Sequence, residues 1–151
     1  MVDYITDKIQ VNLKLLKEYV KSTSEDFIPP LVGRVDIDTW TEKIYNNGYV
    51  ILSLFKGTIV GAIFFYANDE INKMAYVSYL SVNSEFRSQG IASELLRLCF
   101  HKSSENGMTE IGVHTHNPKA LRLYQKIGFE VHEQVRLTGC DLIKTYLVKQ
   151  L

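Results

Sequence analysis

Residues 74–126 alternate between strand-like and helix-like patterns, and this alternation restricts the fold more than any other feature of the chain. Residues 74–82 and 110–115 are rich in the β-branched and aromatic side chains typical of strands. Residues 90–106 place apolar side chains at helical spacing between them, and residues 119–126 predict a second helix, closed by Gly128. Because a helical crossover joins two strands in parallel, the sequence predicts one parallel strand pair.

Antiparallel strands are predicted on both sides of this unit. They are residues 49–55, 59–66, 129–135 and 142–148, whereas the N-terminal part has no clear first strand beyond a short candidate at residues 2–5. The short segment Lys56-Gly57-Thr58 joins the first two of them as a hairpin. We therefore expect an α+β fold in which a mixed, mostly antiparallel sheet contains one parallel pair.

Two helices are predicted before the hairpin. Residues 7–20 form an amphipathic helix whose apolar face is made of Ile9, Leu13, Leu16 and Val20. Pro29 and Pro30 prevent its continuation and mark a loop. The second helix begins after Asp38 as its N-cap and ends at residues 47–48, an Asn-Gly pair.

Length and composition predict a single globular domain, residues 1–151, with 46% hydrophobic and 23% charged residues. Seventeen basic residues balance seventeen acidic ones, so no net field attracts nucleic acid or an anionic membrane. The N-terminus lacks a secretory pattern, and the longest apolar run, residues 59–67, is shorter than the ~20 residues that span a bilayer. We expect a cytoplasmic monomer or homodimer with no nucleic-acid or membrane partner, in which Cys99 and Cys140 stay reduced.

Residues 80–92 place a strand, a short loop and a helix start in direct succession. A loop that enters a helix presents unpaired N–H groups and the positive end of the helix dipole, which suits a pyrophosphate. Gly90 allows close backbone approach, Arg87 adds a permanent positive charge, and Ser88 and Ser93 add hydroxyl groups. The alternative is that Gly90 only begins a helix and that Arg87 is a surface charge.

Residues 117–129 combine helix signals with two polar side chains on one face. Asn117 and Tyr124 lie seven residues apart, so they share a helix face, and the small Ala120 lies between them. An extended thiol ligand fits along such a face. Asn117 also predicts an N-cap, and Gly128 predicts the left-handed residue that ends the helix. For Tyr124 the alternative is a half-buried aromatic with no catalytic role.

Together the two motifs resemble the GCN5-related N-acetyltransferase (GNAT) superfamily of acyltransferases. Residues 87–92 (RSQGIA) match its Arg/Gln-x-x-Gly-x-Gly/Ala coenzyme motif, and residues 117–129 match its second motif. The resemblance is specific over residues 74–129. It implies the GNAT fold, with helices on both faces of the sheet and a bulge that splays the strand at residues 74–82 from the strand at residues 110–115.

The resemblance implies that acetyl-coenzyme A is the co-substrate and that its acetyl group moves to a primary amine of a small molecule or peptide. Main chain near Leu80 and Val82 would pair with the pantetheine arm and polarise the thioester carbonyl, and Tyr124 would protonate the departing thiolate as the catalytic acid. The implied coenzyme-binding residues are Leu80, Val82, Arg87, Ser88, Gln89, Gly90, Ile91, Ala92, Ser93, Asn117, Ala120 and Tyr124. Because neither cysteine belongs to a nucleophile arrangement, we expect direct attack by the amine in a ternary complex.

The general base stays unassigned by the resemblance. Many members of the superfamily carry a carboxylate or histidine on the strand before the coenzyme loop, where this chain has Tyr76 and Ser78. We expect a water chain held by strand hydroxyls and carbonyls to carry the amine proton to solvent, with His116 as the only side-chain alternative.

Two other functions stay open. A coenzyme-sensing or regulatory domain would bind the coenzyme without turnover, although Tyr124 and the complete second motif favour catalysis. His114 and His116 share one face of a predicted strand, which suggests a metal-binding interaction module, but no third ligand is evident and we predict no metal site. Residues 27–40 lie where the superfamily builds its acceptor wall, and they predict either that wall or a packed loop with helix-capping aspartates.

Overall fold

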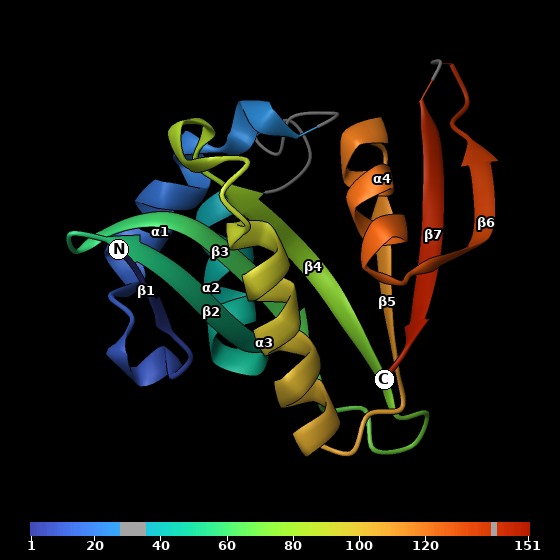
Figure 1. Ribbon diagram of the computed structural model, residues 1–151, viewed down its shortest axis with the longest axis horizontal. Helices are drawn as coiled ribbons and strands as arrows, with labels where there is room; N and C mark the ends of the chain where they lie inside the picture. The colour runs from blue at the N-terminus through green and yellow to red at the C-terminus, as the bar shows by residue number, and fades with distance from the viewer. Residues whose placement is uncertain (28–35, 140–141) are drawn as a thin grey trace.

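The computed structural model describes residues 1–27, 36–139 and 142–151 (Figure 1). Its strands are β1 (Val2–Ile5), β2 (Tyr49–Phe55), β3 (Thr58–Tyr66), β4 (Met74–Val82), β5 (Glu110–Thr115), β6 (Glu130–Arg136) and β7 (Ile143–Gln150). Its helices are α1 (Leu13–Ser22), α2 (Ile37–Asn47), α3 (Ile91–Glu105) and α4 (Pro118–Ile127), with the 3-10 helices η1 (Lys8–Gln10), η2 (Ser24–Asp26) and η4 (Ser84–Phe86). The strands form one sheet in the order β1-β2-β3-β4-β5-β7-β6, and among these described strands only β4 and β5 pair in parallel. The predicted fold class is confirmed.

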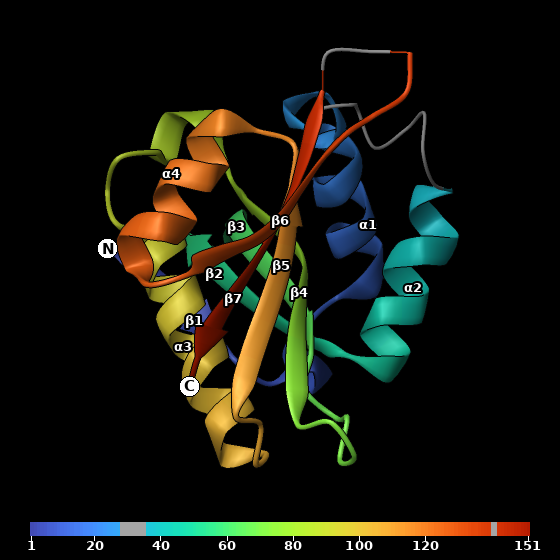
Figure 2. The same ribbon diagram turned by 90° about the vertical axis from the view of Figure 1, so that its right-hand side faces the viewer.

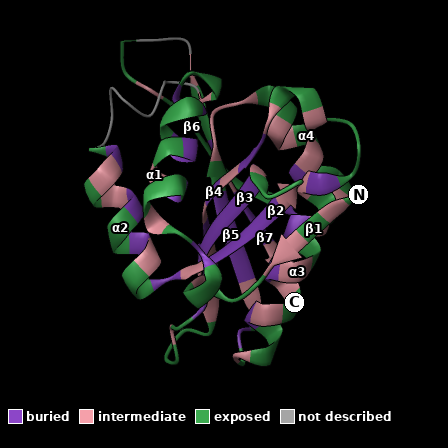
Figure 3. Ribbon diagram, turned by 90° about the vertical axis from the view of Figure 1, so that its left-hand side faces the viewer, coloured by how far each residue is buried: buried purple, intermediate pink, exposed green. Residues whose placement is uncertain are grey.

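Helices cover both faces of the sheet (Figure 2). α3 and α4 lie on one face, where they enclose a core that includes Leu95 and Leu147. α1 and α2 lie on the other face, over a second core that includes Leu16 and Phe64. The central strands carry buried side chains, whereas the outer sides of the helices are exposed (Figure 3). Because each sheet face is buried under apolar helix surface, both faces contribute to stability.

The N-terminal helix begins later than its periodicity predicts. Lys8–Gln10 forms η1, and α1 begins only after Asn12, whose side chain accepts a hydrogen bond from a backbone N–H of the first turn at 3.1 Å. A side-chain cap of this kind fixes where a helix begins. Leu16 and Val20 are buried as predicted, but Ile9 is exposed because it precedes the helix.

The second helix begins earlier than predicted. Asp36, not Asp38, is its N-cap, and the Asp36 carboxylate accepts a hydrogen bond from the Thr39 N–H at 3.3 Å. Asp38 lies in the first turn and forms an ion pair with Lys21 of α1 at 2.9 Å. Asp38 therefore joins the two helices of this face instead of capping one of them.

The other element boundaries fall close to their predicted positions. Lys56 and Gly57 both have positive φ, at 50° and 79°, which matches a two-residue hairpin turn. Gly128, at φ 116°, ends α4 in the left-handed conformation. Of the helices described here, none is both long enough and apolar enough to cross a membrane.

A bulge in β4 reverses the direction in which its side chains point. Tyr79 pairs with Phe64 and Val77 pairs with Phe65, so Ser78 is an extra residue in β4. Val77 belongs to the core under α3 and α4, whereas Tyr79 belongs to the core under α1 and α2. Without the bulge, two residues separated by one position would share a sheet face.

Strands β4 and β5 diverge beyond this bulge (Figure 1). Their parallel pairing runs only from Met74 beside Glu110 to Val77 beside Val113. From there β4 stays paired with β3, and β5 stays paired with β7. The predicted splay is thus confirmed, and the bulge lies in the pairing between β4 and β3.

Candidate active site

A cavity of about 640 Å³ lies at the opening between β4 and β5. The ends of both strands line it, together with the loop that leads into α3 and one side of α4. The predicted coenzyme residues that line it are Leu80, Val82, Arg87, Ser88, Gly90, Ile91, Ala92, Ser93, Asn117, Ala120 and Tyr124. Gln89 is exposed in the loop and is not part of the lining. The fold therefore brings the two sequence motifs to one site.

The loop before α3 turns through left-handed backbone conformations. Ser88 has φ 64° and Gly90 has φ 81°, and a Cβ added at Gly90 would meet no protein atom within 4 Å. The other α-helices begin with side-chain caps, at Asn12, Asp36 and Asn117, whereas α3 has no side-chain cap. The first N–H groups of any α-helix lack intrahelical acceptors, and residues 90–93 line the cavity. This helix start can therefore hold an anion.

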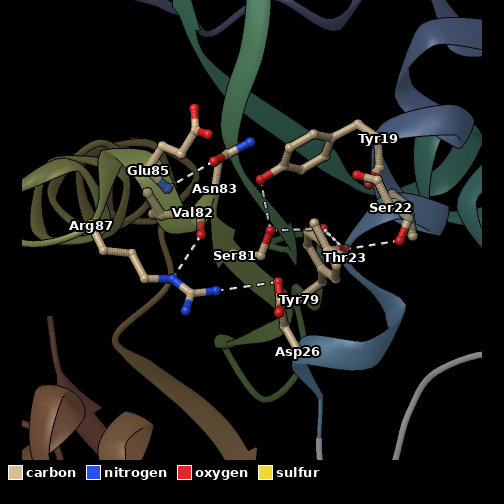
Figure 4. Close-up of polar contacts among 11 residues, drawn as sticks. Tyr19, Ser22, Thr23, Asp26, Tyr79, Ser81, Val82, Asn83, Glu85 and Arg87 are labelled. Carbon is tan, nitrogen blue, oxygen red and sulfur yellow. Dashed lines mark hydrogen bonds and ion pairs between the residues drawn. The ribbon is translucent and has the colours of Figure 1, made fainter.

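Arg87 connects this loop to two neighbouring segments (Figure 4). Its Nε donates to the Val82 carbonyl at 3.0 Å, and its Nη2 lies 3.2 Å from Oδ2 of Asp26. Both side chains of this ion pair are about half exposed, so the pair contributes only ~0.2–1 kcal/mol. The sequence did not predict these partners, which hold the charge of Arg87 at the cavity wall.

A buried set of hydroxyl groups supports β4 from behind (Figure 4). Ser81 shares hydrogen bonds with Tyr19 at 2.8 Å and with Tyr79 at 2.9 Å, and Tyr79 also bonds Thr23 at 2.7 Å. Burial is the main cause that raises the pKa of Tyr19 to about 12 and raises the pKa of Tyr79 further. All of these hydroxyls are therefore neutral, and they fasten the diverging part of β4 to α1.

Tyr124 is the buried phenol of α4. It is 5% exposed, and its ring meets Phe129 edge-on with centroids 5.4 Å apart. Burial raises the pKa of Tyr124 well above its usual value, with smaller contributions from Cys99 and Tyr76. The hydroxyl therefore keeps its proton at neutral pH, as a general acid must.

Asn117 is the N-cap of α4, as predicted. Its Oδ1 accepts a hydrogen bond from the Lys119 N–H at 2.9 Å, and its own N–H donates to Oγ1 of Thr115 at 3.1 Å. Pro118 occupies the first helical position. This arrangement fixes Asn117 at the cavity wall, near one end of the α4 side that also carries Tyr124.

A hydrogen bond across the opening joins two side chains that the sequence did not connect. The Tyr76 hydroxyl of β4 lies 2.7 Å from Nδ1 of His114 on β5, and both residues line the cavity. The His114 ring stacks on Tyr146 of β7, with centroids 4.5 Å apart. The predicted parallel pair of strands was the signal that could have revealed this contact. Tyr76 pairs with Gly112, and His114, two residues further along β5, lies on the same side of the sheet.

The predicted acceptor wall is described only at its two ends, because residues 28–35 lie outside the described part of the chain. Phe27 lines the cavity and stacks on Tyr79, with centroids 5.2 Å apart. Trp40 packs against Phe64 and Tyr79 in the core under α1 and α2. Phe27 therefore lines the cavity, whereas Trp40 packs against Tyr79 in the core.

Within the described part of the chain, the cysteine and the histidines form no metal site. Cys99 is fully buried in the core under α3 and α4, and burial raises the pKa of its thiol. Cys140 lies outside the described residues. Within residues 1–27, 36–139 and 142–151, no group of three or more histidine, cysteine, aspartate or glutamate side chains is arranged to hold a metal ion.

Comparison with known proteins gives this geometry a family. The model of the acetyltransferase (GNAT) family matches residues 14–129, which is more than half of the chain. The chain belongs to this family. Both of the motifs described above lie within the matched residues.

Three similar proteins carry this family's activity in their names. "GCN5-related N-acetyltransferase 6, chloroplastic" of Arabidopsis thaliana is 35% identical over 138 residues, which cover 89% of this GNAT chain and 45% of the relative. The chain thus spans about half the length of that curated relative. A GNAT acetyltransferase structure from Staphylococcus aureus Mu50 superposes with a TM-score of 0.79 at 20% identity, over 100% of this chain and 99% of the other. An aminoglycoside 6'-N-acetyltransferase complexed with coenzyme A gives a TM-score of 0.79 at 13% identity, over 99% and 96%. At these identities the two structures show a shared fold.

Proposed function

We propose that the whole chain, residues 1–151, is one N-acetyltransferase domain that moves the acetyl group of acetyl-coenzyme A to a primary amine. The observation that carries this proposal is the cavity between β4 and β5, which runs from the uncapped start of α3 to the buried phenol of Tyr124. The matching family model and the shared fold with a coenzyme A complex support it.

The residues at the cavity fit the chemical parts of the coenzyme. The N–H groups at the start of α3 suit the pyrophosphate, and Arg87 adds positive charge beside them. The pantetheine arm has amide groups, which suit the edge of β4 near Leu80, where β5 no longer pairs with it. The Asn117 amide and the small Ala120 lie on the α4 side of the same opening.

The chemistry requires an acid for the departing thiolate and a donor for the carbonyl oxygen of the thioester. Tyr124 is our candidate for the acid, because it lines the cavity and its buried hydroxyl is protonated at neutral pH. A main-chain N–H near Leu80 or Val82 is our candidate for the donor, since this part of β4 lines the cavity. Amine, acetyl group and thiol then meet in one ternary complex.

Direct attack by the amine is supported by the state of Cys99. Its thiol is buried in the core under α3 and α4, and burial raises its pKa, so it is neither accessible nor readily ionised. A covalent acetyl-cysteine at this position is therefore unfavourable.

Release of free thiol tests the proposal. The protein is mixed with acetyl-coenzyme A and a panel of amino sugars, amino acids, polyamines and peptides with free N-termini. We expect thiol release that depends on both an amine and the protein. Coenzyme binding without thiol release for any amine would favour a sensing domain instead.

The cytoplasmic location and the monomeric or dimeric state stay predictions, and the name of the plant relative assigns that protein to the chloroplast.

A further inference from the structure

Tyr76 and His114 lie on the opposite side of the sheet from Tyr124. Ile111 and Val113 of β5 belong to the core under α3 and α4. Because side chains alternate along a strand, His114, which follows Val113, points to the other face. Tyr124 belongs to the core under α3 and α4. Yet Tyr76, His114 and Tyr124 all line the same cavity, so both sides of the sheet face one opening between β4 and β5.

The His114 ring is held from two sides. Tyr76 bonds its Nδ1, and Tyr146 stacks on its face at an interplanar angle of 28°. Tyr146 takes this position because Gly112 has no side chain, and a Cβ there would lie 2.7 Å from the Tyr146 hydroxyl. The hydrogen bond from Tyr76 and the stacking by Tyr146 thus come from different strands, β4 and β7. Support of this kind fixes the orientation of the ring, as a functional site requires.

We propose that Tyr76 and His114 together accept the proton of the acceptor amine. This assignment rests on the proposed acetyl transfer and replaces the water chain expected from the sequence. Tyr76 is the catalytic residue that touches the amine, and His114 is the positioning residue that takes the proton through it.

The acceptor amine loses two protons during the reaction, and each has an acceptor among these side chains. The protonated amine gives one proton to the Tyr76 oxygen while the Tyr76 proton moves to Nδ1 of His114, which becomes imidazolium and later releases that proton to solvent. The neutral nitrogen attacks the thioester carbon, so that a C–N bond forms and the C–S bond breaks. The second nitrogen proton replaces the proton that Tyr124 gives to the thiolate.

The charges around His114 favour its neutral form. Its titratable neighbours are Tyr76 on β4, Tyr146 and Lys144 on β7, Glu133 on β6 and His116 on its own chain segment. Partial burial, then the positive charge of Lys144 and then His116 lower the pKa of His114, while Glu133 opposes them. His114 is therefore neutral at pH 7 and able to accept a proton.

The test is the pH profile of kcat/KM for two acceptor amines of different pKa. We expect wild type to lose activity on an acid limb below pH ~6.5 that stays in place when the acceptor is changed. His114→Gln keeps an acceptor for the Tyr76 hydroxyl but cannot titrate in this range, so it should remove that limb and lower kcat/KM at neutral pH by ~10²-fold. Tyr76→Phe should do the same. His101→Gln, on the exposed side of α3, is the matched control and should keep the limb.

Coenzyme affinity and the NMR titration of His114 are two further readouts that separate the outcomes. The affinity for acetyl-coenzyme A, measured by calorimetry, should be unchanged in His114→Gln and Tyr76→Phe. A wild-type protein that neither binds acetyl-coenzyme A nor releases thiol would refute the proposed function itself. An acid limb that persists in both variants, or that disappears only in His116→Gln, would overturn the assignment of the pair alone. NMR titration of the His114 ring in wild type needs no acceptor, and a pKa above 7 would also overturn it.

Discussion

Tyr124 keeps its proton in a buried position, and this property is what a group that protonates a thiolate needs. Tyr124→Phe removes the hydroxyl and little volume. We expect kcat to fall by ~10²-fold while acetyl-coenzyme A affinity barely changes, because the hydroxyl acts mainly in the transition state. Thiol release at saturating amine measures this. Tyr66→Phe, the same chemical change outside the cavity lining, should leave kcat unaltered, and equal rates for both variants would exclude Tyr124 as the acid.

The buried hydroxyl groups behind β4 should contribute to the stability of the fold. Tyr79→Phe removes two hydrogen bonds, to Ser81 and Thr23, whereas Tyr19→Phe removes only one, to Ser81. We therefore expect Tyr79→Phe to lower the free energy of unfolding by ~1–3 kcal/mol and Tyr19→Phe to lower it less. Urea unfolding of the two variants measures the difference. A larger loss for Tyr19→Phe would show that the network is not centred on Tyr79.

At the scale of elements, the start of α3 is the expected pyrophosphate site. Asparagine adopts the left-handed backbone conformation more readily than most residues. Gly90→Asn therefore adds a side chain at a position where a Cβ meets no protein atom within 4 Å. We expect acetyl-coenzyme A affinity to fall by at least ~10-fold, because the added group occupies the approach to the helix N-terminus. Calorimetry measures this affinity.

Gly107 offers a matched control for that prediction. It lies just after the other end of α3, also has positive φ, at 85°, and would also place a Cβ in open space. Gly107→Asn should therefore unfold at a midpoint similar to that of Gly90→Asn but bind the coenzyme like wild type. Equal affinity of the two variants would move the pyrophosphate site away from α3.

Local signals predicted most elements, and contacts between distant segments account for what they missed. Strand β4 and helix α4 follow directly from side-chain periodicity and from Gly128. The bulge at Ser78 changes the facing of Tyr79 without any glycine or proline to mark it, so alternation alone could not reveal it. Helix α1 begins after Asn12, because the side chain of Asn12 caps the helix there, although the apolar spacing begins earlier in the sequence.

The same limit applies to the site. Both coenzyme motifs were readable because each is continuous in the sequence. The ion pair of Arg87 with Asp26 and the hydrogen bond of Tyr76 with His114 join residues from separate elements. Only the assembled fold brings such partners together, so neither pair was predicted.

At the scale of the whole molecule, the sheet separates the two halves of the proposed reaction. Tyr124, the proposed acid, belongs to the core under α3 and α4, whereas the alternation along β5 places His114 on the other face of the sheet. The opening between β4 and β5 is where the two sides meet. We therefore expect the coenzyme to enter from the first side and the amine from the second.

Amide hydrogen exchange, resolved by residue and measured with and without acetyl-coenzyme A, locates the coenzyme site directly. We expect saturating coenzyme to slow exchange at the N–H groups of residues 88–93 and at the unpaired edge of β4 near Leu80, with little change in β1 and β2. Slowed exchange confined to other elements, or none at all at saturating coenzyme, would contradict the claim that the opening between β4 and β5 holds the coenzyme.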